Sequence, residues 1–521
     1  MKRITFLVLA VLMLLSSFSF TGCVKTESES NVLRVCNCED YIDETLLDDF
    51  YKETGIEVVY STYGTNENLY NELVINPNSY DLVVPSEYMI EKLAEEGRIQ
   101  PIDFSKIAKI AEDNGNDNDY DNSISPYIKD RLKSLEIKRG DNIGKNLYDF
   151  MVGYMWGTMG WVYNTEYVTE EEVSSWDGVF YNPNLSKKIT IKDSVRDSYI
   201  VGLAMTYKDE LKNATTNEQI TEILNRTQIE NINAVGEKLS SLKPMLYGFE
   251  VDSGKNDIIL GNIYAYVAWS GDAAYAIDVA SGEVEDEDGN TITEDKIRTL
   301  SYSIPEEGSN IWFDGFVMPS GSTNQENAYK FLEFISRPEN VIRNMDYTGY
   351  TSMIATDEIY EEIVIGWFDE SEDLDENEGK TVDLSYLFGG NAGDYEVVVS
   401  EESYGRLIAQ YPEEKIVAKC AIMGNFDGDT LMTINDMWEG VKSEKFATWL
   451  ILLVVALVVL IALTVIIFRN REKWKWLNPD PNSLTKMEKK GYKRIKVENI
   501  NQQFNLVKIE KKNQNGNKVE I

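Results

Sequence analysis

Two long apolar segments, one near each end, limit where a globular core can form in this chain. At the N-terminus Lys2 and Arg3 precede a largely apolar run that leads into Phe20-Thr21-Gly22-Cys23. This order is typical of a secretory signal peptide that ends at a lipid-accepting cysteine; an uncleaved membrane helix is the alternative. Near the other end, residues 446–468 are uncharged and almost wholly apolar. That length suits a transmembrane helix, which needs roughly 20 such residues.

The charges on either side of the second apolar segment indicate an orientation. The whole chain has a formal net charge of −38, although residues 469–521 are rich in lysine and arginine. Basic flanks stay in the cytoplasm, so we expect a protein of the cell membrane whose acidic part lies outside the cytoplasm. The predicted segments are a signal peptide at 1–22, a linker at 23–30 that starts at the lipidated Cys23, a main domain at 31–440, a transmembrane helix at 446–468 and a basic cytoplasmic tail at 469–521.

Length and composition exclude several classes of function. The chain is 43% hydrophobic and 11% aromatic, as in a folded protein, and the roughly 420 residues between the apolar segments suit two lobes better than one core. The sequence contains no histidine, which excludes Ser-His-Asp triads, Cys-His dyads and His-ligated zinc. Strong acidity opposes binding to nucleic acid and favours a cationic partner, although solubility alone also explains it. Neither a metal ion nor a cofactor is predicted.

The cysteines of the main domain are few. Cys36 and Cys38 lie on the same face of a predicted strand, where a disulfide between them has poor geometry. Free thiols are the preferred interpretation, and a link from one of them to Cys420 is the alternative.

Strands and helices alternate from the start of the main domain. Residues 32–38 alternate as in a strand, residues 40–54 have the apolar spacing of an amphipathic helix, and residues 56–60 form the next strand. This order predicts a parallel α/β architecture. The buried strand at 80–84 is followed by Ser86 and Tyr88, and ligands approach the carboxyl ends of strands in such sheets. An ordinary strand-to-helix cap is the alternative for these two residues.

Aromatic and acidic residues occur together in four separate clusters. Carboxylates are rarely buried without partners, so acids beside tryptophans at strand ends indicate a pocket for a cation. A flexible diamine needs carboxylates at its ammonium ends and aromatic rings along its methylenes, each good cation–π contact adding about 0.5–2 kcal/mol. The clusters are Asp40-Tyr41, Asp193-Ser194-Val195-Arg196-Asp197, Trp269-Ser270-Gly271-Asp272 and Trp312-Phe313-Asp314.

In their order and residue types, these motifs resemble those of the spermidine/putrescine-binding proteins of ABC importers, which have the type II periplasmic-binding-protein fold. The resemblance runs from about Leu33 to Tyr350, and its short motifs are specific only in combination. They are Asp40-Tyr41-Ile42-Asp43, Tyr80-Asp81-Leu82-Val83-Val84-Pro85-Ser86, Tyr154-Met155-Trp156-Gly157-Thr158, Val267-Ala268-Trp269-Ser270-Gly271-Asp272, Pro305-Glu306-Glu307-Gly308-Ser309, Trp312-Phe313-Asp314 and Gly349-Tyr350.

The resemblance implies roles for single residues. Trp312 and Trp269 correspond to the two aromatic walls, and Asp314 to the carboxylate that grips an amine. Asp197 stands at a second acidic position, Asp193 compensates for the acid that Ser194 replaces, and Arg196 orients the carboxylates. Further lining positions are Tyr41, Ser86, Tyr88 and Tyr350, with Cys38 and Asp40 as weaker candidates. Cys38 stands where the family usually has a tryptophan, so one aromatic wall is missing.

The resemblance also implies a two-lobed architecture and a transport function. The first lobe is expected at about 31–150 and 313–357, the second at about 151–312 and 358–440, with the ligand in the cleft between them. The protein would capture a polyamine without chemistry on it and deliver it to an ABC permease, coupled to a cytoplasmic ATPase, with the C-terminal helix as a tether. Two alternatives are a receptor that senses an organic cation and a cell-surface enzyme with paired carboxylates. Trp156, Trp176 and Trp367 are expected to pack in the core.

Overall fold

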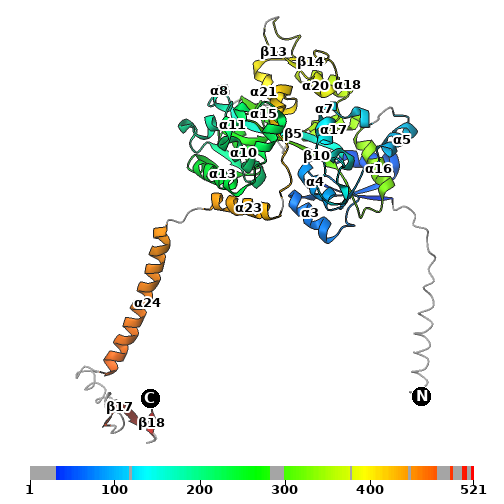
Figure 1. The fold of residues 1–521 in the computed structure, drawn as a ribbon. Coiled ribbons are helices and arrows are strands. Elements are labelled where there is room, and N and C mark those ends of the chain that lie inside the picture. The colour runs from blue at the N-terminus through cyan, green and yellow to red at the C-terminus, as the bar shows by residue number, and fades with distance from the viewer. Residues whose placement is uncertain are drawn as a thin grey trace, which may run out of the picture. The chain divides into compact units, whose positions relative to one another are not determined.

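The computed structural model describes residues 31–116, 120–281, 299–375, 378–426, 428–443, 448–477, 493–496, 507–512 and 518–520. The predicted signal peptide, the linker to residue 30 and Cys23 lie outside these residues. The chain divides into two compact units, Met1–Lys442 and Ser443–Ile521, and each is described by itself. Within the first unit, separate groups of strands are each covered by helices (Figure 1).

The first lobe contains a parallel sheet with the strand order β2-β1-β3. The predicted alternation of strand and helix is confirmed here, and Gly55, with φ 69°, ends the first helix in the left-handed conformation that glycine favours. The helix expected from residue 40 begins only at Thr45, because Asp40 has φ 51° and the chain turns there. The elements are β1 Val32–Cys38, α2 Thr45–Thr54, β2 Glu57–Tyr63, α3 Asn66–Ile75, β3 Leu82–Val83 and α4 Glu87–Glu95.

Segments from later in the chain pack onto this sheet. Phe50 of α2 contacts Phe331 and Phe334 of α16 with ring centroids 5.2 and 5.3 Å apart. Ser125 caps the helix that Pro126 begins. The elements are β4 Ile99–Gln100, α5 Phe104–Asn114, α6 Tyr120–Ser123, α7 Pro126–Ser134, η1 Gly140–Asn142, η2 Leu147–Phe150, β11 Met318–Pro319, α16 Gln325–Ile335 and α17 Pro338–Thr348.

The strand β5 Val152–Asn164 joins the two hydrophobic cores of this unit. All thirteen of its residues are buried, and it contributes Trp156 to one core and Trp161 to the other. Its first half pairs with β10 and β12, and its second half pairs with β8 and β9. The other strands of this sheet are β6 Ile189–Lys192, β7 Leu246–Glu250, β8 Ala265–Trp269, β9 Leu300–Ser303, β10 Ser309–Phe316, β12 Thr351–Ser352 and β15 Cys420–Ala421.

Most helices that follow β5 pack around the second core, whereas Ile258, Ala273 and Ala276 belong to the first. Trp176 packs against Trp161 at 5.2 Å between ring centroids, and Trp156 and Trp176 are buried as predicted, while the half-buried Trp367 lies beside Phe368. The helices are α8 Glu170–Val173, α9 Trp176–Phe180, η3 Pro183–Leu185, α10 Val195–Thr206, α11 Lys208–Asn213, α12 Asn217–Leu224, α13 Ile229–Leu242, α14 Ser253–Ile259, α15 Ser270–Ser281 and α23 Gly428–Lys442.

The segment between α17 and β15 contains short helices and one hairpin. Its elements are α18 Asp357–Ile359, the π-helix η5 Tyr360–Ile365, α19 Gly366–Phe368, β13 Lys380–Asp383, α20 Ser385–Phe388, β14 Glu396–Val399, α21 Glu401–Gln410 and α22 Glu414–Val417. Cys36, Cys38 and Cys420 are all free thiols, as the preferred interpretation of the sequence has it.

The second unit contains the helix α24 Thr448–Leu477 and an antiparallel sheet of β16 Lys493–Lys496, β17 Val507–Lys512 and β18 Lys518–Glu520. Across the described residues, no helix combines the length and the apolar character that crossing a membrane requires. The transmembrane helix predicted at 446–468 is therefore not supported. The cytoplasmic tail predicted at 469–521 is likewise not shown.

Candidate functional site

Asp314 of β10 lies within a cluster of aromatic side chains. The strand shifts register between Asp314 and Gly315, and Ser86 forms an isolated bridge with Asp314 from the first lobe. The Tyr41 hydroxyl donates to Asp314 Oδ2 at 2.9 Å, whereas the buried Oδ1 has no hydrogen-bond partner among the described residues. Burial raises the pKa of Asp314 to about 6, and the nearby hydroxyls of Ser86 and Tyr41 act in the opposite direction.

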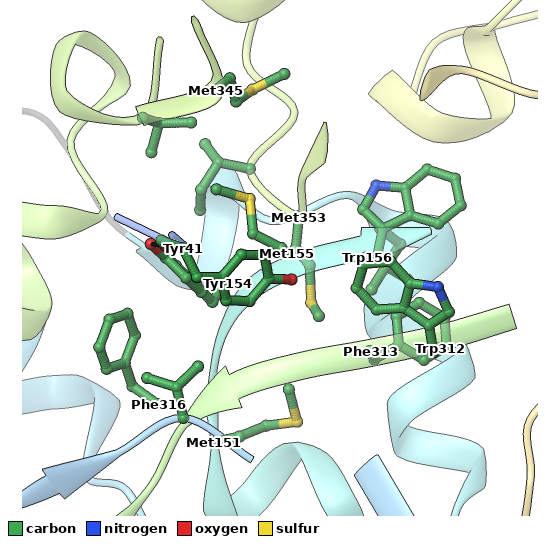
Figure 2. Packing of buried hydrophobic residues seen from close by; sticks show 14 of the residues in the cluster. Tyr41, Met151, Tyr154, Met155, Trp156, Trp312, Phe313, Phe316, Met345 and Met353 are labelled. Carbon is green, nitrogen blue, oxygen red and sulfur yellow. Dashed lines mark hydrogen bonds between the residues drawn. The ribbon is translucent and has the colours of Figure 1, made fainter. Parts of the chain in front are cut away.

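Aromatic rings surround this carboxylate on several sides. Tyr350 meets Tyr41 edge to face at 5.1 Å and Trp312 at 5.7 Å between ring centroids. Figure 2 shows Trp312 and Phe313 on the same strand, with Tyr41 and Tyr154 beside it. The Tyr154 hydroxyl donates to the Tyr41 carbonyl. The indole Nε1 of Trp312 is buried and has no partner among the described residues, so this ring can face an incoming group.

Two glycines allow the rings of Trp312 and Tyr350 to pack directly against the backbone of neighbouring segments. A Cβ at Gly157, which pairs with Trp312 across the sheet, would lie 2.5 Å from Trp312 Cζ2. A Cβ at Gly271 would lie 2.4 Å from the ring of Tyr350. Real Cβ atoms do not approach this closely, so any larger residue at either glycine would displace the aromatic ring that it faces.

A second acidic group lies on the other side of Tyr350. The Tyr350 hydroxyl donates to Asp272 Oδ1 at 3.3 Å, and Asp272 is in the first turn of α15, three residues after Trp269. Asp197 of α10 is buried, which raises its pKa; Ser194, Lys192 and the Trp269 indole oppose that rise. Tyr350 therefore connects the Asp314 group to the group around Trp269.

Lys192 is part of this second group and was not a sequence candidate. It ends β6 and is 1% exposed. Its ammonium lies 4.2 Å from the centroid of Trp269, 3.6 Å from Asp272 Oδ2 and 3.7 Å from Glu250 Oε1. It also donates to the Val251 carbonyl at 2.5 Å. The sequence could have indicated Lys192, because it lies at the carboxyl end of a buried strand, the same kind of position that made Ser86 a candidate.

Tyr88 and Arg196 form a contact between the two lobes. The Arg196 guanidinium lies 3.6 Å from the centroid of Tyr88 and 4.6 Å from that of Phe426. Its Nη1 donates to the Gly424 carbonyl at 3.2 Å, and its Nε is 3.8 Å from Glu67 Oε1. One face of Tyr88 is thus covered by Arg196. The guanidinium bridges α10 to α4, rather than only orienting carboxylates as the resemblance implies.

The remaining sequence candidates lie at different distances from Asp314. Cys38, at the end of β1, is half-buried, and burial together with the charge of Asp314 raises the pKa of its thiol to about 12. Asp40 is exposed in the turn before α2. Asp193 pairs with Lys442 at 3.1 Å. The charge of Asp314 thus acts on Cys38, whereas Asp40 is exposed to solvent and Asp193 pairs with Lys442.

Glu87 is a further buried acid that the sequence did not single out. It follows Ser86 directly and is 2% exposed, and its Oε2 accepts a hydrogen bond from the Phe313 N–H at 2.9 Å. Burial raises the pKa of Glu87 to about 8, so this carboxyl is largely neutral at pH 7. Glu87 and Tyr88 also border a cavity of about 460 Å³ that reaches Thr221, Asn225 and Asn425; this cavity adjoins Asp314 without including it.

Comparisons with known proteins show the family to which the chain belongs. A family model for bacterial extracellular solute-binding proteins matches residues 45–365, more than half of the chain. The putrescine-binding periplasmic protein SpuD of Pseudomonas aeruginosa is 30% identical over 319 residues, which are 60% of this chain and 75% of that protein. The putrescine-binding periplasmic protein PotF of Escherichia coli is 29% identical over 332 residues, 62% of this chain and 78% of that protein.

Solved structures support the fold. The spermidine/putrescine ABC transporter substrate-binding protein PotD of Streptococcus pneumoniae is 26% identical and aligns with a TM-score of 0.52 over 79% of this chain and 98% of that chain. The TpPotD lipoprotein of Treponema pallidum aligns with a TM-score of 0.53 at 18% identity, over 79% of this chain and 99% of that chain. The expected two-lobed α/β architecture is thereby confirmed. The chain belongs to the family of bacterial extracellular solute-binding proteins.

Proposed function

We propose that this protein captures a polyamine such as putrescine or spermidine outside the cytoplasm and delivers it to the permease of an ABC importer, with no chemistry on the ligand. The observation that carries this proposal is Asp314. Among the described residues, no lysine or arginine nitrogen lies within the 4.0 Å ion-pair distance of its carboxylate. Buried carboxylates normally have a cationic partner, and an ammonium group of the ligand supplies one.

The surroundings of Asp314 suit an alkylamine. Trp312, Tyr350 and Tyr41 place an indole and two phenol rings around the carboxylate, and such rings cover methylenes and attract ammonium groups. The names of the related proteins, which include putrescine and spermidine/putrescine binders, support the same ligand class. Tyr41, Ser86, Trp312, Asp314 and Tyr350 are the proposed contacts at this end, and Trp269 and Asp197 lie at the other.

Closure of the two lobes follows from where these residues lie. Ser86 and Tyr41 come from the first lobe, while Asp197 and Trp269 come from elements around the second core. The Arg196–Tyr88 stack joins α10 to α4, so it forms only when the lobes are together. A ligand that contacts both sides shifts the population toward the closed form, and we propose that the permease recognises this form.

Isothermal titration of the purified full-length protein with putrescine, spermidine and spermine tests the proposal. A micromolar Kd corresponds to about −8 kcal/mol, which two paired ammoniums and several aromatic contacts can supply. Loss of labelled putrescine uptake on deletion of the gene would connect binding to transport. Folded protein that gives no heat with any of the three amines would contradict the assignment.

We also propose that a lipid on Cys23 attaches the protein to the membrane. The support is the order of the N-terminal sequence, in which a basic start and an apolar run precede Gly22-Cys23. Metabolic labelling with a radioactive fatty acid should mark the wild-type protein and leave Cys23→Ala unlabelled. Equal labelling of both proteins would contradict this point and would leave the ligand assignment untouched.

A further inference from the structure

The two ends of the proposed site differ in how their charge is balanced. Asp314 has no cationic partner among the described residues. At the other end, Lys192 lies within 3.7 Å of both Glu250 and Asp272, and the Lys255 ammonium is 3.9 Å from Asp272 Oδ1. Lys192 and Lys255 face Glu250 and Asp272 there, and Lys192 also acts on the buried Asp197. The protein's own cations therefore offset acidic charge at this end, while the Asp314 end has none among the described residues.

The surroundings of the Lys192 ammonium are those that an alkylammonium ligand would have. It lies 4.2 Å from the centroid of Trp269 and 5.9 Å from that of Tyr266, and it has a carboxylate on either side. Lysine is almost never fully buried unless it is paired, and this side chain is 1% exposed. The four methylenes of Lys192 place its ammonium on the Trp269 ring, which the proposed function assigns to the ligand.

We propose that Lys192 determines specificity by occupying, with its own ammonium, the place on Trp269 and beside Asp272 that an additional amine of a longer polyamine would need. The site would then favour a short diamine such as putrescine over the triamine spermidine. This inference rests on the proposed function. Like charges a few Å apart repel strongly in a buried site, so a ligand ammonium cannot share this position with Lys192.

A purely structural role for Lys192 is the alternative. In that case its charge only balances Glu250 and Asp272, and its loss would lower stability without changing the order in which amines bind. Glu250 has a second role, because its Oε2 accepts a hydrogen bond from the Gly254 N–H at 2.8 Å. The ratio of affinities for two amines therefore separates the alternatives, whereas stability alone does not.

The test is isothermal titration of the full-length protein with putrescine and spermidine at one pH and ionic strength. Wild type should bind putrescine at least about tenfold more tightly than spermidine, and Lys192→Met should shift this ratio by at least about tenfold toward spermidine. Lys255→Met is the matched control, since Lys255 faces the same acid but is 31% exposed. Its ratio should stay within about threefold of wild type.

Folding is checked by circular dichroism and thermal melting of every variant. Removing Lys192 takes a cation away from the buried Glu250, Asp272 and Asp197, so Lys192→Met/Glu250→Gln removes one acid together with that cation and leaves the net charge unchanged if the single variant does not fold. An unchanged ratio in a folded variant, or a wild type that prefers spermidine, would overturn the inference. A wild type that binds no polyamine at all would instead contradict the proposed function, and the two failures are thus distinguishable.

Discussion

Replacing Asp314 with asparagine should weaken binding and at the same time stabilise the free protein. The carboxylate is 9% exposed, so a bound ammonium would form a desolvated ion pair with it. Breaking such a pair by removing one partner costs about 3–5 kcal/mol, which raises Kd by roughly 10²-fold to 10³-fold. Asparagine can still accept the hydrogen bond from Tyr41, so the site should keep its shape.

The gain in stability follows from the pKa of the free protein. Burial raises the pKa of Asp314 from 3.8 to about 6, and this shift corresponds to at most about 3 kcal/mol of destabilisation while the group is charged in the folded state. Above pH 6 the full penalty is present. As the pH falls from about 6 to about 4, the folded protein takes up the proton while the unfolded chain remains ionised, and the wild type regains stability.

Thermal melting at pH 7.5 and pH 4.5, together with titration calorimetry at pH 7.5, measures both effects. Asp314→Asn should melt a few °C above wild type at pH 7.5, and the difference should shrink at pH 4.5. Asp193→Asn is the matched control, because Asp193 pairs with Lys442 and should leave Kd within about threefold. A folded Asp314→Asn protein that binds putrescine within threefold of wild type would refute the reasoning.

Four further perturbations test the site. Tyr41→Phe removes the hydroxyl that donates to Asp314; calorimetry should show an affinity loss of about 1–2 kcal/mol, and full affinity would exclude a positioning role. Gly157→Val forces a side chain into Trp312, so putrescine binding should fall more than tenfold even where circular dichroism shows a folded protein. Arg196→Met removes the stack on Tyr88; small-angle scattering with saturating putrescine should show incomplete closure, and a wild-type response would contradict the proposed interlobe role. Wild-type affinity should fall as the pH drops below about 6, the pKa of Asp314, by up to tenfold per pH unit, and calorimetry from pH 7.5 to 5.0 checks this.

Much of the site could be predicted because its residues occupy strand ends and specific motifs. Tyr41, Trp312, Asp314 and Tyr350 meet in the structure, although Tyr41 is far from the other three in the sequence. Asp40 could not be placed correctly from spacing alone. An amphipathic pattern continued through it, whereas the chain turns there with φ 51° and leaves Asp40 exposed.

The sequence shows how many acidic residues there are, but it does not show which of them are paired with a cation in the folded protein. The resemblance implies that Asp193 compensates for the acid that Ser194 replaces, yet Asp193 pairs with Lys442 from α23, more than two hundred residues later. Glu87 was not a sequence candidate, but burial raises its pKa to about 8, and its carboxylate accepts a hydrogen bond from the Phe313 N–H. Which carboxylates carry charge depends on long-range packing, and short motifs do not contain that information.

Cys38 and Lys192 act on opposite ends of the proposed site, and together they make Asp314 the contact on which binding depends most. Cys38 stands beside Asp314 where the resemblance predicts an aromatic wall, so one cation–π contact of about 0.5–2 kcal/mol is lost at that end. At the other end Lys192 lies over Trp269, so that ring is already engaged by an internal cation. Asp314 has no cation of the protein's own among the described residues, so a ligand ammonium forms its strongest single contact there, and Asp314→Asn should weaken binding more than any single aromatic substitution.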